Sequence, residues 1–272
     1  MVTDGFKRTF GGTAGNQTYY LTKLGVSPIL YSSAGNDFSD YKKFLKKNRI
    51  ETNNIFIAKN LTTAAGFAIT DPKDNQIWIY SKGAMAEARK LSINNIYSKI
   101  DNSLVIISPN DFVAMSKYVS ECVNKNIPFV FDPAFYTPYL DLKTLLIGVQ
   151  KAEIIFGNDY EIAFLEKRIK KKLTSLLSPI QILVKTLGDQ GSEIWHDKKL
   201  TKVGIYKSKV IDPTGAGDAY RAGFLFGYLQ NLPIKTCGKM GAIVASFAVE
   251  IKGTMNLVFT KTKFLKRLSS SF

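Results

Sequence analysis

The stretch that decides the fold is residues 153–186, which read EIIFGNDYEIAFLEKRIKKKLTSLLSPIQILVKT. Two short apolar runs, 153–157 and 181–186, flank a segment with helical spacing over 159–177. The apolar runs do not alternate with polar residues, which is typical of strands buried on both faces. A strand, a helix and a second strand in this order predict one unit of a parallel sheet.

The same pattern extends toward the N-terminus. Further apolar runs lie at 104–108 and 128–132, with helical spacing at 111–125 and 141–150. We therefore predict an α/β protein with a mostly parallel sheet covered by helices on both faces. Ligands bind such sheets at the carboxyl ends of the strands, where this chain carries Asp132, Asn158 and the turn 186–188.

The first hundred residues predict a different arrangement. Gly11–Asn16 lead into a helix over 16–24, followed by a strand at 28–32 and a helix near 38–48. Residues 62–70 and 76–80 alternate around 71–75, which has the composition of a hairpin turn. We expect this hairpin to form a small lid within a single domain spanning 1–272.

Composition excludes several classes of protein. The 272 residues are 45% hydrophobic and contain neither a long apolar span nor a signal-peptide core, so we expect a cytoplasmic protein that does not enter a membrane. Two cysteines and one histidine are too few for a disulfide framework or a zinc cage. Cys122 lies in an apolar helical pattern and is expected in the core.

The segment 211–223, IDPTGAGDAYRAG, carries the chemistry. Gly215 and Gly217 allow close approach of the backbone to a ligand, and the loop enters a helix at once. The N–H groups of 215–218 would then face one spot at the positive end of a helix, where an anion binds. Asp218 in the first turn could accept a proton from an attacking hydroxyl. The alternative is an ordinary capped helix, and the loop alone does not decide between the two.

The segment 212–218 resembles the C-terminal signature of the ribokinase (PfkB) family of carbohydrate and nucleoside kinases, with Pro213 where threonine is commonest. Gly11-Gly12-x-x-x-Asn16 matches a second family element. Asn158-Asp-Tyr-Glu161 is similar to an Asn-x-x-Glu motif, and Lys185–Gly191 is similar to a Thr-Leu-Gly-x-x-Gly strand end. Four elements in the family's order make the resemblance specific over nearly the whole chain.

The resemblance implies a ribokinase-like three-layer sandwich and an enzyme that transfers phosphate from ATP to an alcohol group of a nucleoside or sugar. It implies that Asp218 is the catalytic base and that Gly215, Ala216 and Gly217 form the anion hole. Asn158 and Glu161 would help to hold Mg²⁺ and its waters. The implied nucleotide-binding residues are Thr186, Gly188, Gly191, Asp212 and Thr214, and the implied substrate-side residues are Gly12 and Asn16.

Several of these residues have a simpler interpretation as well. Asn16 is either a ligand of substrate hydroxyls or the N-cap of a helix, and 186–191 is either a nucleotide channel or a strand-ending turn. Residues 241–253 either pack beside adenine or belong to a core helix. Phe67, Trp78 and Tyr80 stack on a substrate ring or form the apolar face of the lid.

The substrate is suggested by the segments 62–71, 74–76 and 83–85. They are similar to a prokaryotic adenosine-kinase-like branch, so we expect a nucleoside, adenosine first, before ribose or fructose.

The net charge of +15 also invites a nucleic-acid interpretation. The lysines are scattered rather than gathered on one predicted surface, so we expect no specific nucleic-acid binding. A positive protein also attracts an anionic substrate such as ATP.

The start of the chain departs from the family pattern. Family members begin with a core strand and a Gly-x-x-x-x-Asp element, whereas only ten residues precede Gly11 here. Three explanations stay open: an internal methionine taken as the start, a decaying gene, or a strand supplied by a second subunit. They lead to two further expectations, a homodimer formed through the lid and a catalytically impaired ligand-binding homologue.

Overall fold

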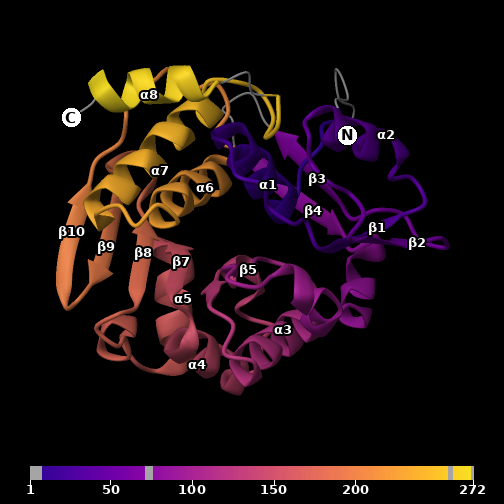
Figure 1. Cartoon of the computed structure of the whole chain (residues 1–272), viewed down its shortest axis with the longest axis horizontal. Helices are drawn as coiled ribbons and strands as arrows, with labels where there is room; N and C mark the ends of the chain where they lie inside the picture. Colours follow the sequence, from indigo (N-terminus) through magenta and orange to yellow (C-terminus); the bar gives the residue numbers. More distant parts are fainter. Residues whose placement is uncertain (1–7, 71–75, 257–259, 271–272) are drawn as a thin grey trace.

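The central element is a six-stranded sheet in the order β10-β9-β8-β7-β6-β5 (Figure 1). The computed structural model describes residues 8–70, 76–256 and 260–270. The strands are β5 (Val105–Ile107), β6 (Phe129–Phe131), β7 (Ile154–Asn158), β8 (Ile182–Thr186), β9 (Ser192–His196) and β10 (Lys199–Val203). Strands β5 to β8 run parallel, and β9 and β10 add an antiparallel edge. The predicted mostly parallel sheet is confirmed.

Helices cover both faces of this sheet (Figure 1). One core joins the sheet to α3 (Phe112–Asn124), α4 (Leu142–Lys151) and α5 (Asp159–Ile169). The other joins it to α1 (Thr13–Leu24), α6 (Ala216–Tyr228) and α7 (Ile234–Val249), with α8 (Lys261–Ser270) contributing Phe264. The apolar strands are divided between the cores by their pleat: Ile154 and Phe156 face the second core, and Ile155 faces the first.

The end of α5 differs from the prediction. The sequence pattern predicted a helix to residue 177, but α5 ends at Ile169 because Lys170 adopts a left-handed conformation with φ 58°. A short 3-10 turn at Leu173–Ser175 follows, and it buries Leu173 completely. The turn at Lys170 directs the chain back toward the core, and Leu173 becomes buried as a result.

The N-terminal region forms two small sheets beside α1 (Figure 1). β1 (Ser32–Gly35) pairs in parallel with β2 (Ile55–Ala58), so the strand predicted at 28–32 lies a few residues later; α2 (Ser39–Lys47) connects the two. β3 (Ala65–Thr70) and β4 (Gln76–Ser81) form the predicted antiparallel hairpin, which we call the lid. Its expected turn at 71–75 lies outside the described residues. Two 3-10 segments, Gly83–Lys90 and Ile93–Lys99, lead from the lid to the main sheet.

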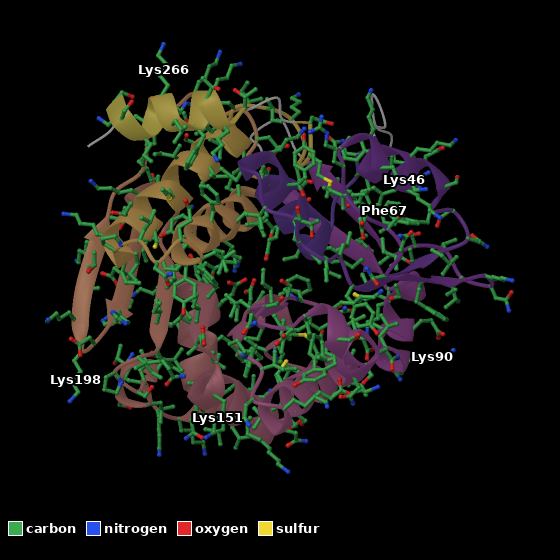
Figure 2. The ribbon with its side chains drawn as sticks, in the orientation of Figure 1. Lys46, Phe67, Lys90, Lys151, Lys198 and Lys266 are labelled. Carbon is green, nitrogen blue, oxygen red and sulfur yellow. The ribbon has the colours of Figure 1, made fainter. Side chains whose placement is uncertain are left out.

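Charge and cysteine placement agree with the sequence analysis. Figure 2 places the labelled lysines Lys46, Lys90, Lys151, Lys198 and Lys266 on different sides of the molecule. Both cysteines are buried and unpaired. Within the described ranges, no helix has the length and apolar character needed to cross a membrane.

Candidate active site

The side chains of Asn16 and Asp218 meet where α1 crosses the start of α6. Asn16 Nδ2 donates a hydrogen bond of 2.7 Å to Asp218 Oδ2, across 202 residues of sequence. Helix α1 begins at Thr13 with Gly12 as its N-cap, at φ 95°, so Asn16 lies inside the helix and the N-cap interpretation of Asn16 is wrong. The structure brings together two residues that the sequence analysis placed on the substrate side and at the catalytic base.

Two buried amide oxygens lie beside this pair. Asn16 and Gln17 are 4% and 2% exposed, and neither Asn16 Oδ1 nor Gln17 Oε1 has a hydrogen-bond partner in the described structure. Gln17 Nε2 lies 3.3 Å from Ser108 Oγ, just beyond the carboxyl end of β5. Buried polar atoms are normally paired, so these two unpaired acceptors are oxygens that hydroxyl donors of a ligand could satisfy. Gln17 was not singled out from the sequence.

The glycine loop has the geometry of a helix start. Gly215 is the N-cap of α6 with φ 82° and ψ 0°, a conformation that favours glycine. The Ala216 N–H donates to the Pro213 carbonyl at 3.1 Å, so the prediction that all four N–H groups of 215–218 face one ligand is wrong for Ala216. Within the described residues, no acceptor takes the N–H of Gly215, Gly217 or Asp218. Three free donors at the positive end of a helix can bind an anion.

Asp212 fixes the shape of this loop. Its Oδ1 accepts from the Thr214 N–H at 2.9 Å, and its Oδ2 accepts from the Gly253 N–H at 2.9 Å. Burial tends to raise the pKa of Asp212, but these hydrogen bonds outweigh it and hold the pKa below its ordinary value. The structure thus places Asp212 and Thr214 in the frame of the glycine loop.

Thr254 connects the glycine loop to the start of α1. Its carbonyl accepts from Tyr20 Oη at 2.6 Å, and its Oγ1 donates to the Phe10 carbonyl at 3.1 Å. A Cβ on Gly215 would approach Thr254 Cγ2 to 2.8 Å. The sequence analysis missed Thr254, because an isolated threonine in a loop carries no signal of these three contacts.

Polar residues gather at the carboxyl ends of β7 and β8. Asn158 and Thr186 are register partners on these adjacent strands. Asn158 caps α5 in a reciprocal pair with Glu161: Asn158 Oδ1 accepts from the Glu161 N–H, and Glu161 Oε2 accepts from the Asn158 N–H, both at 2.8 Å. Burial raises the pKa of Glu161.

This pair fits Mg²⁺ held through water better than direct ligation. Each of its cap hydrogen bonds occupies one oxygen, and no hydrogen bond among the described residues uses Glu161 Oε1. Among the described residues, no three His, Cys, Asp or Glu side chains are arranged to hold a metal. Mg²⁺ commonly keeps several waters and binds one or two carboxylates together with substrate phosphates.

The turn after β8 depends on its glycines. Gly188 and Gly191 have φ of 60° and 88°, and a Cβ on Gly191 would overlap the Val203 carbonyl oxygen. The Leu187 N–H donates to the Gly191 carbonyl at 2.8 Å, which closes the turn. The turn brings Gly188 to the surface beside Thr186, at the same edge of the sheet as Asn158.

An ion pair lies beneath the glycine loop. Arg221 Nη2 donates to Asp132 Oδ1 at 2.9 Å, and Arg221 Nε lies 2.6 Å from Asp132 Oδ2 without hydrogen-bond alignment. The two side chains are 9% and 1% exposed. Arg221 Nη2 is also 3.8 Å from Glu161 Oε2. Asp132 was expected at the strand ends, whereas Arg221 was missed because a basic residue inside a helix normally faces solvent.

The electrostatic environment of Asp218 suits a base. Asp218 is partly exposed but densely surrounded, and this desolvation raises its pKa to about 6. Arg221 and the hydrogen bonds from Asn16 and Gln17 lower the pKa, while Asp132 raises it. A carboxylate with a pKa near 6 is ionised at neutral pH and is a stronger base than an ordinary aspartate.

Residues 241–249 lie in α7, so most of the segment 241–253 fits the core-helix interpretation. Gly241 packs against Tyr220 of α6, and Ala242 and Ser246 are buried in α7. Ser246 Oγ donates to the Ile243 carbonyl and accepts from Arg267. Packing beside adenine stays a prediction.

The lid contacts the segment that follows β6. Tyr80 of β4 stacks on Phe135 with ring centroids 5.7 Å apart and planes 16° from parallel. Phe67 of β3 remains 49% exposed. The side chain of Trp78 lies outside the described part of the structure, so its predicted role is not addressed.

Known proteins resemble this chain in sequence and in fold. The pattern described as pfkB family carbohydrate kinase matches residues 2–261. A nucleoside kinase of Methanocaldococcus jannaschii is 32% identical over 265 residues, covering 96% of this chain and 86% of that protein. A nucleoside kinase of Methanothermobacter thermautotrophicus is 31% identical over 271 residues, covering 96% and 85%.

Solved structures agree with these relatives. The nucleoside kinase of Burkholderia thailandensis in complex with inosine superposes with a TM-score of 0.92 at 26% identity, covering 100% of this chain and 88% of that one. The Methanocaldococcus jannaschii nucleoside kinase, described as an archaeal member of the ribokinase family, has a TM-score of 0.88 at 31% identity, covering 96% and 86%. These neighbours confirm the ribokinase-like fold, and because the family pattern spans nearly the whole sequence, the chain belongs to the pfkB family of carbohydrate kinases and is an ATP-dependent carbohydrate or nucleoside kinase.

Proposed function

We propose that this enzyme transfers the γ-phosphoryl group of ATP to a hydroxyl of a nucleoside, with adenosine as the preferred acceptor, and with Asp218 as the base. The observation that carries the proposal is the hydrogen-bonded pair of Asn16 and Asp218 at the free N–H groups of α6. A proton acceptor and an anion site then lie at one helix end, which is the arrangement that phosphoryl transfer to a hydroxyl requires.

In the proposed reaction the nucleoside hydroxyl gives its proton to Asp218. Its oxygen forms a bond to the γ-phosphorus while the bond from that phosphorus to the β,γ-bridging oxygen breaks, leaving ADP. The N–H groups of Gly215, Gly217 and Asp218 would hold the negative charge on the transferring group. Their positions are fixed before the reaction by the Asp212 hydrogen bonds, so little reorganisation is needed.

Mg²⁺, when bound, would offset negative charge on the β- and γ-phosphates. Glu161 Oε1 and the free lone pair of Asn158 Oδ1 are the oxygens that would orient its waters. Thr186, Gly188 and Gly191 lie at the same edge of the sheet and are proposed to line the path of the nucleotide.

The nucleoside acceptor is supported by the relatives and by the unpaired amide oxygens. Two relatives, 32% and 31% identical over 96% of this chain, carry the name nucleoside kinase, and a structural neighbour was solved with inosine. Asn16 Oδ1 and Gln17 Oε1 are acceptors that ribose hydroxyls could fill. Gly12 is proposed to set the start of α1 and so the position of Asn16.

The test is a comparison of kcat/KM for adenosine, inosine, ribose and fructose with ATP. We expect adenosine and inosine to exceed both sugars by more than about tenfold, adenosine first. Asp40→Asn, an exposed change on α2, is the control that should keep the wild-type rate. Faster turnover of ribose or fructose would refute the nucleoside assignment. Tight nucleoside binding without turnover would instead identify an impaired ligand-binding homologue.

The lid is the surface proposed to form a homodimer. Phe67, Ile79 and Tyr80 are 49%, 58% and 59% exposed on its two strands, and a second lid is an apolar surface of matching kind. Light scattering should give twice the chain mass, and Phe67→Ser with Ile79→Ser should reduce it to one chain. A monomeric wild-type protein at micromolar concentration would contradict this arrangement.

A further inference from the structure

The guanidinium of Arg221 lies beneath the first turn of α6. Arg221 follows Asp218 by three residues, and helical side chains lean toward the N-terminus of their helix, so its head group reaches back to the glycine loop. Asp132 clamps the head group from the end of β6, with one hydrogen bond of 2.9 Å and a second approach of 2.6 Å. Glu161 lies 3.8 Å from the same head group. Arg221 therefore connects three structural elements that carry proposed site residues.

One nitrogen of the guanidinium lies beside Gly217 of the glycine loop. A Cβ on Gly217 would lie 2.8 Å from Arg221 Nη1. None of the hydrogen bonds among the described residues uses Nη1, because Asp132 occupies the Nε and Nη2 side. A positive N–H group of Arg221 thus lies beside Gly217, whose own backbone N–H is free in the described part of the chain. Glycine leaves space for this nitrogen because it has no side chain.

The negative charges of the carboxylates around the Arg221 guanidinium also favour a cation at this position. Asp132, Glu161 and Asp218 are three carboxylates that act on Arg221 and raise its pKa, although burial alone would lower it. Around Asp218, α1 supplies the neutral groups of Asn16 and Gln17 as well as the phenol of Tyr20. The charged groups are Asp132, just after β6, and Arg221 on α6. Arg221 is the cation in this set that favours the ionised form of Asp218.

We propose that Arg221 is a positioning residue for phosphoryl transfer, whose guanidinium, clamped by Asp132, holds the Gly217–Asp218 turn in place and supplies positive charge beneath the anion site. This inference rests on the proposed function of Asp218 as the base. It assigns a role to a side chain outside the four sequence elements discussed above. A side chain at position 217 would have to displace Arg221 Nη1, because a Cβ there would lie 2.8 Å from it.

The experiment compares the variants Arg221→Met, Arg221→Lys and the double variant Arg221→Met with Asp132→Asn. The double variant removes the charge of Asp132 together with that of Arg221, so Asp132 is not left as an unpaired buried carboxylate, and the urea midpoint separates loss of stability from loss of catalysis. Arg168→Met is the matched control. Arg168 lies on α5 and donates hydrogen bonds to the carbonyls of Pro138 and Leu140, away from the glycine loop. For each protein, kcat and KM for adenosine are measured across pH, together with the midpoint of urea unfolding.

We expect Arg221→Met and the double variant to lose kcat by about 100-fold, with a change in KM below about threefold, as for the loss of a group that orients the reacting atoms. The acid limb of the kcat/KM profile should move to higher pH, because Asp218 loses its neighbouring cation. Arg221→Lys should recover part of the rate, since it keeps the charge without the fork of donors. Arg168→Met should keep the wild-type kcat and pH profile.

A double variant that folds and keeps kcat within about threefold of wild type, with an unmoved acid limb, would overturn the inference. Asp218→Asn in the same assay keeps the two proposals apart. If Asp218→Asn is inactive while the double variant is not impaired, only the role of Arg221 fails. If the wild-type protein does not turn over, or Asp218→Asn keeps its rate, the proposed function fails and the role of Arg221 fails with it.

Discussion

Replacing Asp218 by asparagine should make the protein more stable at neutral pH while removing most of its activity. The pKa of Asp218 rises from its ordinary value of 3.8 to about 6 in the fold, chiefly because burial removes water from the carboxylate. Between these two values the folded protein holds a proton that the unfolded chain has released. The free energy of unfolding therefore falls as the pH rises through this range, and the penalty is complete above the folded pKa.

The size of this penalty follows from the shift. A rise of about 2 pKa units corresponds to at most about 3 kcal/mol, at 1.36 kcal/mol per unit. Asparagine is nearly the same shape and carries no charge, and its Oδ1 can still accept the hydrogen bond from Asn16. We expect Asp218→Asn to match wild type near about pH 4 and to exceed it by up to about 3 kcal/mol near about pH 8. Near about pH 8, the kcat of Asp218→Asn should be about 10²–10⁴-fold below that of wild type, as for a lost general base.

Urea unfolding of both proteins at several pH values measures the difference. Asp141→Asn provides a control of opposite sign. Burial tends to raise the pKa of Asp141, but hydrogen bonds from Thr144 hold it below its ordinary value. That variant should be less stable than wild type at neutral pH, and the loss should disappear as the pH falls through the folded pKa of Asp141, which lies below the ordinary value. If Asp218→Asn is no more stable than wild type near about pH 8, the desolvated environment derived for Asp218 is incorrect.

Three further substitutions test the surroundings of the site. Gly215→Ala forces a side chain into the left-handed region and toward Thr254 Cγ2, so it should cost about 1–2 kcal/mol of stability by urea unfolding, and we expect kcat to fall at least tenfold. Gly223→Ala would place its Cβ 2.5 Å from the Met240 carbonyl oxygen between α6 and α7, which should cost about 1–3 kcal/mol by urea unfolding with little change in KM. Glu161→Gln should raise the Mg²⁺ concentration needed for half-maximal rate by about tenfold, measured by titration at fixed ATP, and leave the adenosine KM within about threefold. An unchanged Mg²⁺ requirement would show that Glu161 acts only as the cap of α5.

The sheet could be predicted because its strands carry their signal locally. The apolar runs that became β7 and β8 are buried on both faces, so composition alone marks them, and Asn158 was expected at the carboxyl end of the first of them. The end of α5 could not be predicted in this way. Its pattern continues past Ile169, and the turn at Lys170 depends on burial of Leu173, which is a tertiary effect.

The residues of the site also differ in whether their signal is local or depends on the tertiary structure. Gly215 and Asp218 were identified because a turn glycine and a first-turn carboxylate are local features. The pairing of Asn16 with Asp218 spans 202 residues and was not predicted, because resemblance to a family implied only that both residues belong to the site. Arg221 could not be predicted at all, because only the fold reveals that Asp132 lies within reach of a helix position normally exposed to solvent.

The central claim is that Asp218 and the turn before it transfer phosphate from ATP to a nucleoside hydroxyl. Phosphorus NMR of the protein with ATP, Mg²⁺ and adenosine tests it most directly, since it follows every phosphorus atom. We predict one ADP and one nucleoside monophosphate for each ATP consumed, and nucleoside monophosphate formation about 10²–10⁴-fold slower with Asp218→Asn. Release of inorganic phosphate at the same rate with and without adenosine, with no phosphorylated nucleoside, would contradict the claim.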